Sequence, residues 1–474
     1  MYPEQGPFEN RRQPSVAADA DVTAIFSAMA AFALLIGLVG YSHWFIFTLP
    51  LLAFTVGIFY KKGDHFGLGV GVLITISLSY YFALGLIPAL VTIIRIAIIG
   101  MLAVGFLKGR TERSAYKVPL VFLALFMAIA AIGSYYNSLY VSISELKILF
   151  AAVFFFALIL SAKASDGFPS ILFGLIAGIL SLSALSFLFF PAVGYAYLVD
   201  PNSAVTAMGR FSGVLNHPQL LACFIAVNLP LILYAYLTRS GPISSLAFFM
   251  TICASLLIAV SSSRTGFLAV FVGLFSLLFM LRKNRDANVR RRSNLVWALI
   301  WISTLLALVT SFEQVQQFIY KTDDVKGGIK LSGRDEIIYA SWQAFIAKPI
   351  FGNGFQVPSD FTEHGGATFG ISSDVSSVEK CFFLTMLLEE VGLVGTFLFL
   401  GAIVALLRVW YRKEAYVAIA AMLAFLTINI GEACILSPSS IGGLCWLSIF
   451  AVHNLTFRPD DPGPGHDPDR RGLY

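Results

Sequence analysis

Three arginines lie in short polar segments that separate long apolar runs of the sequence. Arg210 belongs to the segment GRFSGVLNHPQ, Arg264 to SSSRTG and Arg334 to LSGRDE. A guanidinium group is always charged and presents a planar fork of donors that fits phosphate oxygens. If the fold brings the three side chains together, they form a pocket for an anionic headgroup, and a lipid-linked diphosphate is the natural ligand. Alternatively, each arginine pairs with a nearby carboxylate (Asp200, Asp335 or Glu390) or extends to a membrane interface.

The composition of the chain indicates whether it is a soluble protein or a membrane protein. Of its 474 residues, 58% are hydrophobic and only 12% are charged, and the mean hydropathy is +0.80. A typical soluble domain has about 25% charged residues. The chain is therefore predicted to be a polytopic membrane protein. Its long unbroken apolar runs favour helices over a transmembrane barrel, whose strands alternate in polarity.

The apolar runs predict an all-α transmembrane helix bundle. A helix needs about 20 apolar residues to cross the hydrocarbon core, and this criterion predicts about 14 spans, within a range of 12–14. The predicted spans are 22–40, 43–60, 66–82, 86–107, 117–136, 145–162, 169–190, 219–237, 243–260, 265–282, 295–311, 382–407, 415–433 and 439–456.

Basic residues in the short loops predict the orientation of the bundle. The segment LRKNRDANVRRRSN, at 281–294, is strongly basic and is expected on the cytoplasmic side. With the predicted spans, the other basic short loops and both termini fall on that same side. The opposite, external face then holds the loops 137–144, 191–218 and 261–266 and a large loop at 312–381. All three arginines belong to this external face.

The polarity pattern also predicts the organisation of the chain. The segment 1–21 is polar and lacks the features expected of a cleaved signal peptide. Within the large loop, 335–347 is expected to form an amphipathic helix on the membrane surface, and 348–355 a turn rich in Gly and Pro. The predicted regions are a cytoplasmic polar N-terminus at 1–21, an N-terminal bundle at 22–204, a central region at 205–430 that includes the loop 312–381, a last span at 431–456 and a disordered cytoplasmic tail at 457–474.

The other residues with chemical potential carry weaker signals. The five cysteines have no metal-ligand spacing and are interpreted as small core residues, so no metal site is expected. Arg95 lies near the middle of a predicted span, where a charge is costly and often functional. Arg95 could form a structural ion pair or contact a cavity, and the sequence leaves both alternatives open. Glu432 lies near an external helix end and could meet one of the arginines.

Four segments resemble the motifs of the O-antigen ligase and polymerase family. RFSGVLNHPQLLA resembles the family pattern R-x-x-G-x-x-x-(D/H)-P-N-x-(L/F)-A, and SSSRTGFL resembles its S-x-S-R-(G/T) turn before a span. LSGRDEIIYASWQAFIAKPIFGNGF is similar to its S-G-R…W…P-x-x-G-x-G stretch, and FFLTMLLEEVGLVG to the helix that follows its large loop. The matches come in the family's order and cover roughly 205–430.

The resemblance implies a multi-pass glycosyltransferase of the bacterial inner membrane with its active site facing the periplasm. Such enzymes take a glycan from an undecaprenyl diphosphate carrier and use neither a metal nor another cofactor. By motif, Arg210 and Arg334 would bind the diphosphate, and Arg264 and His217 would contact the substrate. The implied partners are the undecaprenyl-diphosphate-linked oligosaccharide, an acceptor glycan, the lipid bilayer, and chain-length regulator and export proteins, with no nucleic acid.

The sequence departs from the family pattern where many ligases have His-Asn after the large loop. It has SSVEKCFF there, so Glu379 is the predicted general base and Lys380 a predicted phosphate contact. His364 is an alternative base. This departure favours a polymerase of exopolysaccharide or O-antigen over a ligase that transfers glycan to lipid A-core. In-line attack by the acceptor hydroxyl on the carrier-linked sugar would make the reaction inverting.

Two functions of other classes compete with this prediction. A transporter or flippase of lipid-linked sugars would also have many spans, but such proteins tend to show two similar halves, and the sequence shows no internal repeat. A non-catalytic scaffold of an export complex would have no reason to gather arginines on one face.

Overall fold

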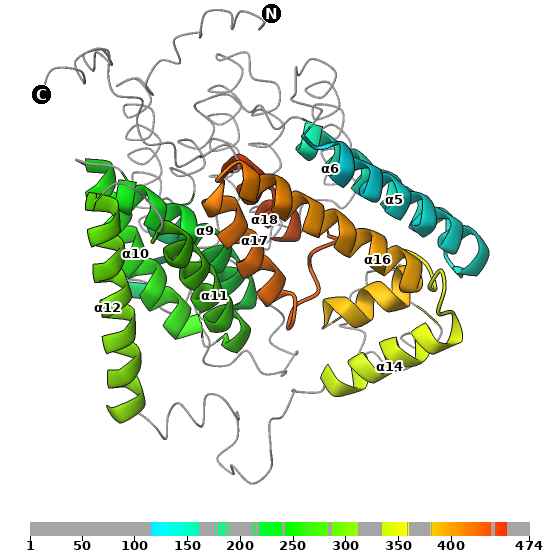
Figure 1. Cartoon of the computed structure of the whole chain (residues 1–474). Coiled ribbons are helices and arrows are strands. Elements are labelled where there is room, and N and C mark those ends of the chain that lie inside the picture. Colours follow the sequence, from blue (N-terminus) through cyan, green and yellow to red (C-terminus); the bar gives the residue numbers. More distant parts are fainter. Residues whose placement is uncertain are drawn as a thin grey trace, which may run out of the picture.

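The computed structural model describes a helical bundle (Figure 1). The described residues are 115–160, scattered positions within 176–188, 211, 213, 218–238, 242–261, 263–282, 287–310, 334–357, 359, 380, 382–437 and 441–452. Over these residues the elements are helices and no strand is formed, which confirms the predicted all-α class for this part of the chain. The N-terminal segment, the four predicted spans before residue 108 and the C-terminal tail lie outside the described residues.

Six of the described helices are long and apolar enough to cross a membrane. Their ends lie within a few residues of six predicted spans, because each apolar run is bounded by polar or turn-forming residues. The six helices are α5 (Lys117–Asn137), α6 (Val141–Leu160), α9 (Pro218–Thr238), α10 (Pro242–Ser261), α11 (Arg264–Leu281) and α16 (Phe383–Arg412).

Three other helices lie at the predicted spans 295–311, 415–433 and 439–456, and the first two of them differ from the prediction. Helix α12 (Ala287–Thr310) begins inside the basic segment that was expected to be a loop. Arginine has a high helix propensity, so the basic residues extend the helix beyond its apolar part. Helices α17 (Tyr416–Ile428) and α18 (Ile441–Val452) have 13 and 12 residues. Described residues flank α17 on both sides, and it is shorter than the roughly 20 residues that a complete crossing requires; α18 is given over the described residues of its segment alone.

Helix α9 lies at the centre of the larger group of helices. It packs against α10, α11, α17 and α18, and most of its side chains are buried. The helices approach closely where small residues meet. A Cβ atom placed on Gly266 of α11 would lie 2.5 Å from Cβ of Ala222 in α9. Small residues at helix contacts are typical of bundles in lipid, where close backbone approach supplies packing energy.

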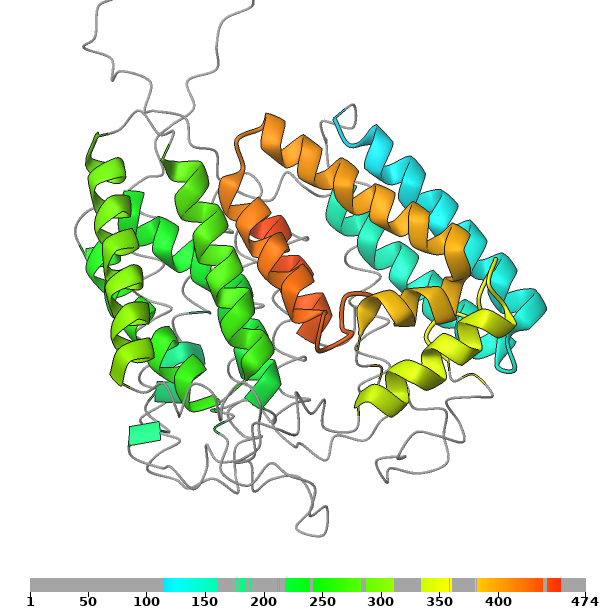
Figure 2. The same ribbon diagram turned by 60° about the horizontal axis from the view of Figure 1, so that its bottom comes forward.

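A second group of helices stands beside this core. Figures 1 and 2 show α5, α6 and α16 on one side of the molecule and α9 to α12 on the other, with α17 and α18 between them. The outer helices expose large apolar side chains, such as Leu125 of α5, Leu256 of α10 and Phe397 of α16. Such exposure would be unfavourable in water and is expected where the side chains contact lipid.

The amphipathic helix predicted at 335–347 is present as α14 (Arg334–Ala347). It packs on the first part of α16, as Figure 2 shows. Phe345 is buried against the protein, whereas Trp342 and Ile346 are exposed. The apolar residues expected to share one face therefore divide between a protein contact and an exposed face. The exposed face is compatible with the membrane-surface position that the sequence predicts, which stays a prediction.

Candidate functional site

Helix α16 is interrupted at Gly392, inside the span predicted at 382–407. Gly392 has φ 65° and ψ −169°, a conformation that only glycine adopts readily. The interruption separates a short first part, 383–391, from the long remainder of the helix (Figure 2). The kink frees backbone groups from the helical ladder, and these groups need partners from outside the helix.

The turn that follows α14 supplies those partners. The Leu393 N–H donates to the Pro349 carbonyl at 2.8 Å, and the Asn353 N–H donates to the Glu389 carbonyl at 2.7 Å. Gly352, with φ 74°, lies directly against the α16 backbone, where a Cβ atom would lie 2.5 Å from the Val391 nitrogen. The KPIFGNGF turn and the kink of α16 therefore form one interlocked backbone unit.

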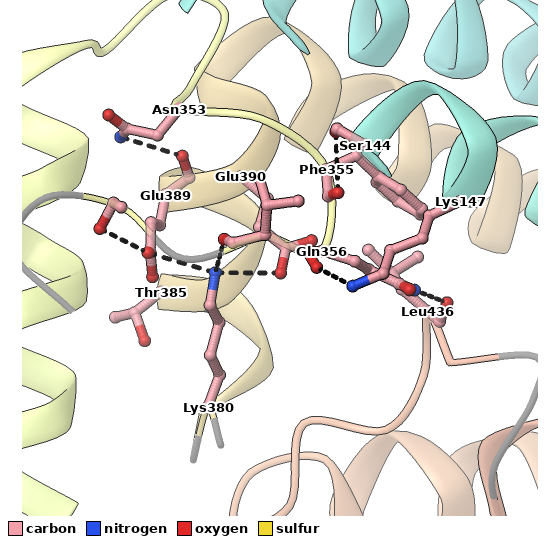
Figure 3. Close-up of polar contacts among 12 residues, drawn as sticks. Ser144, Lys147, Asn353, Phe355, Gln356, Lys380, Thr385, Glu389, Glu390 and Leu436 are labelled. Carbon is pink, nitrogen blue, oxygen red and sulfur yellow. Dashed lines mark hydrogen bonds and ion pairs between the residues drawn. The ribbon is translucent and has the colours of Figure 1, made fainter. Parts of the chain in front are cut away.

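A buried charge cluster lies on this unit, made of Lys380, Glu389 and Glu390 (Figure 3). The Lys380 Nζ is 3.2 Å from Glu389 Oε1 and 3.1 Å from Glu390 Oε1. Ser359 donates a hydrogen bond of 2.9 Å to the same oxygen of Glu389. All three charged side chains are buried. Removing one partner of a buried pair typically costs about 3–5 kcal/mol, because the other charge stays buried without compensation.

The electrostatics of the cluster keep Lys380 protonated. Burial of the ammonium lowers the pKa of Lys380, but the Glu389 and Glu390 carboxylates raise it by more, so the pKa lies above that of an ordinary lysine. Within the described part of the chain, Oε2 of each glutamate is buried without a hydrogen-bond partner. Lys380 is the cation that contacts both carboxylates directly.

A second lysine, Lys147 of α6, balances the charge of the cluster. Its Nζ donates to the Gln356 carbonyl at 2.6 Å, and it interacts electrostatically with Glu390 (Figure 3). Gln356 has a positive φ of 53°, which is uncommon for a residue with a side chain. Its side-chain amide donates to the Leu436 carbonyl. The strained residue thus connects α6 to the turn before α18.

The ends of α5 and α6 hold the same turn from the other side. The hydroxyls of Ser134 and Ser144 are 2.7 Å apart. The Ser144 hydroxyl donates to the Phe355 carbonyl at 2.9 Å, and the Phe355 N–H donates to the Ser134 hydroxyl at 3.1 Å. Lys348 donates to the Asn137 carbonyl at 2.7 Å. The loop predicted at 137–144 and the large loop predicted at 312–381 therefore meet at one end of the bundle, as a shared face requires.

The turn after α17 connects the cluster to α11. The Ala433 N–H donates to the Lys380 carbonyl at 3.2 Å. Asn429 holds this turn, because its side-chain oxygen accepts from the N–H groups of Cys434 and Ile435, each at 2.8 Å. At Gly431 a Cβ atom would lie 3.2 Å from Cβ of Thr265, the second residue of α11. The turn after α17 therefore contacts both the buried cluster, through Lys380, and the beginning of α11, through Thr265.

Two of the three predicted arginines, Arg264 and Arg334, belong to the described residues, and each is the first residue of a helix. Arg264 is the first residue of α11, where Ser263 caps the helix by accepting from the Gly266 N–H at 3.2 Å. Arg334 is the first residue of α14, and its backbone alone is described. In Figures 1 and 2, the N-terminal end of α14 is directed towards the side on which α11 and α17 lie.

Several predicted site residues lie outside the described residues, namely Arg210, His217, His364, Glu379 and the span residue Arg95. The position of Phe211 gives the approximate location of Arg210, which directly precedes it in the sequence. The Phe211 N–H donates to the Val260 carbonyl at 3.3 Å, which places the residue after Arg210 beside the end of α10. Glu379 directly precedes Lys380. Lys380 itself, predicted to contact phosphate, has its ammonium engaged by two carboxylates, so its phosphate contact stays a prediction.

Sequence reasoning missed Glu389, Lys147 and Gln356, and it considered Glu390 only as a carboxylate partner of an arginine, whereas Glu390 pairs with Lys380. The pair of adjacent glutamates was a usable signal, because it stands inside an apolar run where charges are rare and usually functional. Gln356 carried no such signal. Among the described residues, no group of three or more His, Cys, Asp or Glu side chains is arranged to hold a metal ion.

The sequence also matches a known family over part of its length. Residues 249–376 match the family model described as O-antigen ligase. The match includes Arg264, Arg334, α14 and the KPIFGNGF turn, and it ends before Lys380 and α16. No curated protein matches the chain closely enough to be counted as a relative. The match confirms, over residues 249–376, the resemblance to the O-antigen ligase family that the sequence motifs carry, and the apolar helices indicate a multi-pass membrane protein.

Proposed function

We propose that the chain is a polymerase that joins undecaprenyl-diphosphate-linked repeat units into an exopolysaccharide or O-antigen at the periplasmic face of the bacterial inner membrane. The family match carries this proposal, because it indicates a glycosyl-transferring membrane enzyme. Four segments meet at one end of the bundle, and this supports an active site there. The segments are 134–147, 348–357, the residue at 380, and 429–437.

The chemistry of the proposed reaction needs arginines and one base. Arg210 and Arg334 bind the donor diphosphate and neutralise the charge that develops as it leaves, which preorganised donors do effectively in a dehydrated site. The acceptor hydroxyl attacks the anomeric carbon, the new glycosidic bond forms, and the carrier diphosphate leaves with the electron pair of the broken bond. Glu379 takes the hydroxyl proton. In-line displacement inverts the anomeric centre, and no metal takes part.

The test is a comparison of arginine variants in cells that lack the chromosomal copy. Arg210→Ala and Arg334→Ala are expected to abolish polymer and to leave the protein in the membrane at normal amounts. Arg412→Ala, at the opposite end of α16, is the matched control and is expected to give normal polymer. Polymer length on gels and the amount of each variant in isolated membranes are measured. Normal polymer from Arg334→Ala at normal expression would remove that residue from the mechanism.

A ligase is the second candidate, because the matching family model is described as O-antigen ligase. The two functions predict different products in a deletion strain. Loss of a polymerase leaves single repeat units, whereas loss of a ligase leaves long glycan that is still attached to the carrier. Loss of a flippase would instead trap carrier-linked units on the cytoplasmic side. Sizing the glycan and identifying its lipid anchor distinguishes the three outcomes.

A further inference from the structure

We propose that the buried cluster of Lys380, Glu389 and Glu390 is a positioning centre that sets the relative positions of the segments bearing the reactive groups. This inference rests on the proposed function. In this proposal the three residues position other residues that act on the substrate, and they do not contact the substrate themselves. In particular, it replaces a direct phosphate contact of Lys380 by a structural link between predicted catalytic segments.

The first step is the connectivity of Lys380, which belongs to three contacts at once. Its side chain holds the first part of α16 through both glutamates, and it donates to the Val357 carbonyl at 3.4 Å. Its backbone carbonyl accepts from Ala433 in the turn after α17. One residue therefore connects the end of the turn after α14, the beginning of α16 and the turn that contacts α11.

The second step is what each of these segments carries. Glu379, the predicted base, is covalently adjacent to Lys380. Arg334 begins α14, which is continuous with the turn that the cluster holds. Arg264 begins α11 next to Thr265, which lies against Gly431. A displacement of Lys380 is thus transmitted to all three predicted functional positions.

The third step is the burial and the charge balance of the cluster. Two glutamates and two lysines, Lys147 and Lys380, give a neutral group at the junction. A group that contacts a diphosphate needs a surplus of positive charge, and this cluster has none. Lys380, Glu389 and Glu390 are also 8% exposed or less. Both features fit a role in holding backbone segments and not in binding an anion.

The experiment compares charge-altering variants of the full-length protein in detergent with a lipid-diphosphate-linked glycan as the donor. The variants are Lys380→Met, Glu389→Gln with Glu390→Gln, and the triple variant that combines all three changes. The triple variant replaces the three fully buried charges by neutral groups and leaves only the charge of the partly buried Lys147. Lys413→Met is the matched control. It removes a lysine at the other end of α16, where the ammonium lies over the Tyr116 ring.

The expected result is a selective effect on the rate of transfer. Per folded molecule, Lys380→Met lowers kcat about a hundredfold, the loss typical of reacting groups misplaced by about 1 Å. The KM for the donor stays near the wild-type value. The triple variant recovers most of kcat, and Lys413→Met retains the wild-type kcat. Lys380→Arg, which retains the charge but changes the hydrogen-bonding geometry, gives an intermediate kcat and replaces Lys380→Met if that variant does not accumulate.

Three outcomes overturn the proposal in distinguishable ways. A raised donor KM in Lys380→Met without recovery in the triple variant means that Lys380 binds the donor directly. A wild-type kcat per folded molecule in every variant means that the cluster supports folding alone. An absence of glycan transfer by the wild-type protein overturns the proposed function, and the positioning role falls with it.

Discussion

Gly392 offers the most direct perturbation of the site, because its backbone conformation and its surroundings both exclude a side chain. Its φ of 65° and ψ of −169° belong to a region that costs an ordinary residue about 1–3 kcal/mol. A Cβ atom would also lie 2.6 Å from the Phe351 nitrogen and closer still to the Ile350 carbonyl group. These are backbone atoms of the interlocked turn, so relief of the overlap requires the turn to move.

Gly392→Ala is therefore expected to lower the free energy of unfolding by about 3 kcal/mol, at the upper end of the strain range. That loss corresponds to roughly a hundredfold change in the ratio of folded to unfolded protein. Thermal unfolding of the purified protein in detergent measures the loss, and polymer length in cells measures its consequence. Gly401→Ala is the matched control in the same helix. There the added methyl group meets the Phe122 ring, whose outer atoms can shift.

A partner substitution tests whether the effect arises at the contact itself. Gly352 lies against the Glu390 and Val391 backbone, so Gly352→Ala should displace the same turn. Because either substitution alone separates the two segments, the double variant should lose less stability than the sum of the single losses. Strict additivity would mean that the two glycines act independently. A Gly392→Ala protein with wild-type thermal stability and normal polymer would refute the interlocked unit.

Three further perturbations address the surroundings of this unit. Ser144→Ala removes the donor to the Phe355 carbonyl, and we expect a loss of about 1–3 kcal/mol in unfolding free energy, measured by thermal unfolding with the exposed Ser255→Ala as control. Asn429→Leu leaves two backbone N–H groups without their acceptor, so we expect a loss of about 3 kcal/mol and reduced polymer; an unchanged unfolding midpoint would contradict this. The pKa of Lys380 is raised, so its stabilisation is fully present below the ordinary lysine pKa and is lost only as the pH rises through the raised value. Thermal unfolding across alkaline pH should show this loss in wild-type protein and a smaller one in Lys380→Met.

The fold of the described region was largely predictable because lipid imposes a simple rule on the sequence. Each crossing helix must be a long apolar run, and the ends of α9, α10 and α11 follow from the polar or turn residues that interrupt those runs. The helix α14 was predictable from the spacing of its apolar residues. These features depend on local sequence alone, which is why no knowledge of tertiary contacts was needed.

The features that sequence reasoning missed depend on contacts between distant segments. The interruption of α16 at Gly392 follows from the approach of the turn after α14, about which the apolar run gives no information. The end of α17 follows from the turn that Asn429 holds directly after it. The sequence places Lys380 at the end of the predicted external loop and gives no sign that its side chain is buried. Its burial depends on two glutamates that approach it only once α16 begins.

The gathering of arginines at one end of the bundle is the prediction on which the proposed function depends, and two contacts support it from opposite directions. The Phe211–Val260 hydrogen bond brings the residue after Arg210 to the end of α10, and α11 begins at Arg264 a few residues further along the chain. The Gly431–Thr265 contact brings the turn linked to Lys380 to the same place. Segments that are more than 200 residues apart in sequence thus meet beside the beginning of α11. A site assembled from such distant segments requires rigid connections between them, and the buried charge cluster, the interlocked glycines and the Asn429 turn are the connections that the described residues contain.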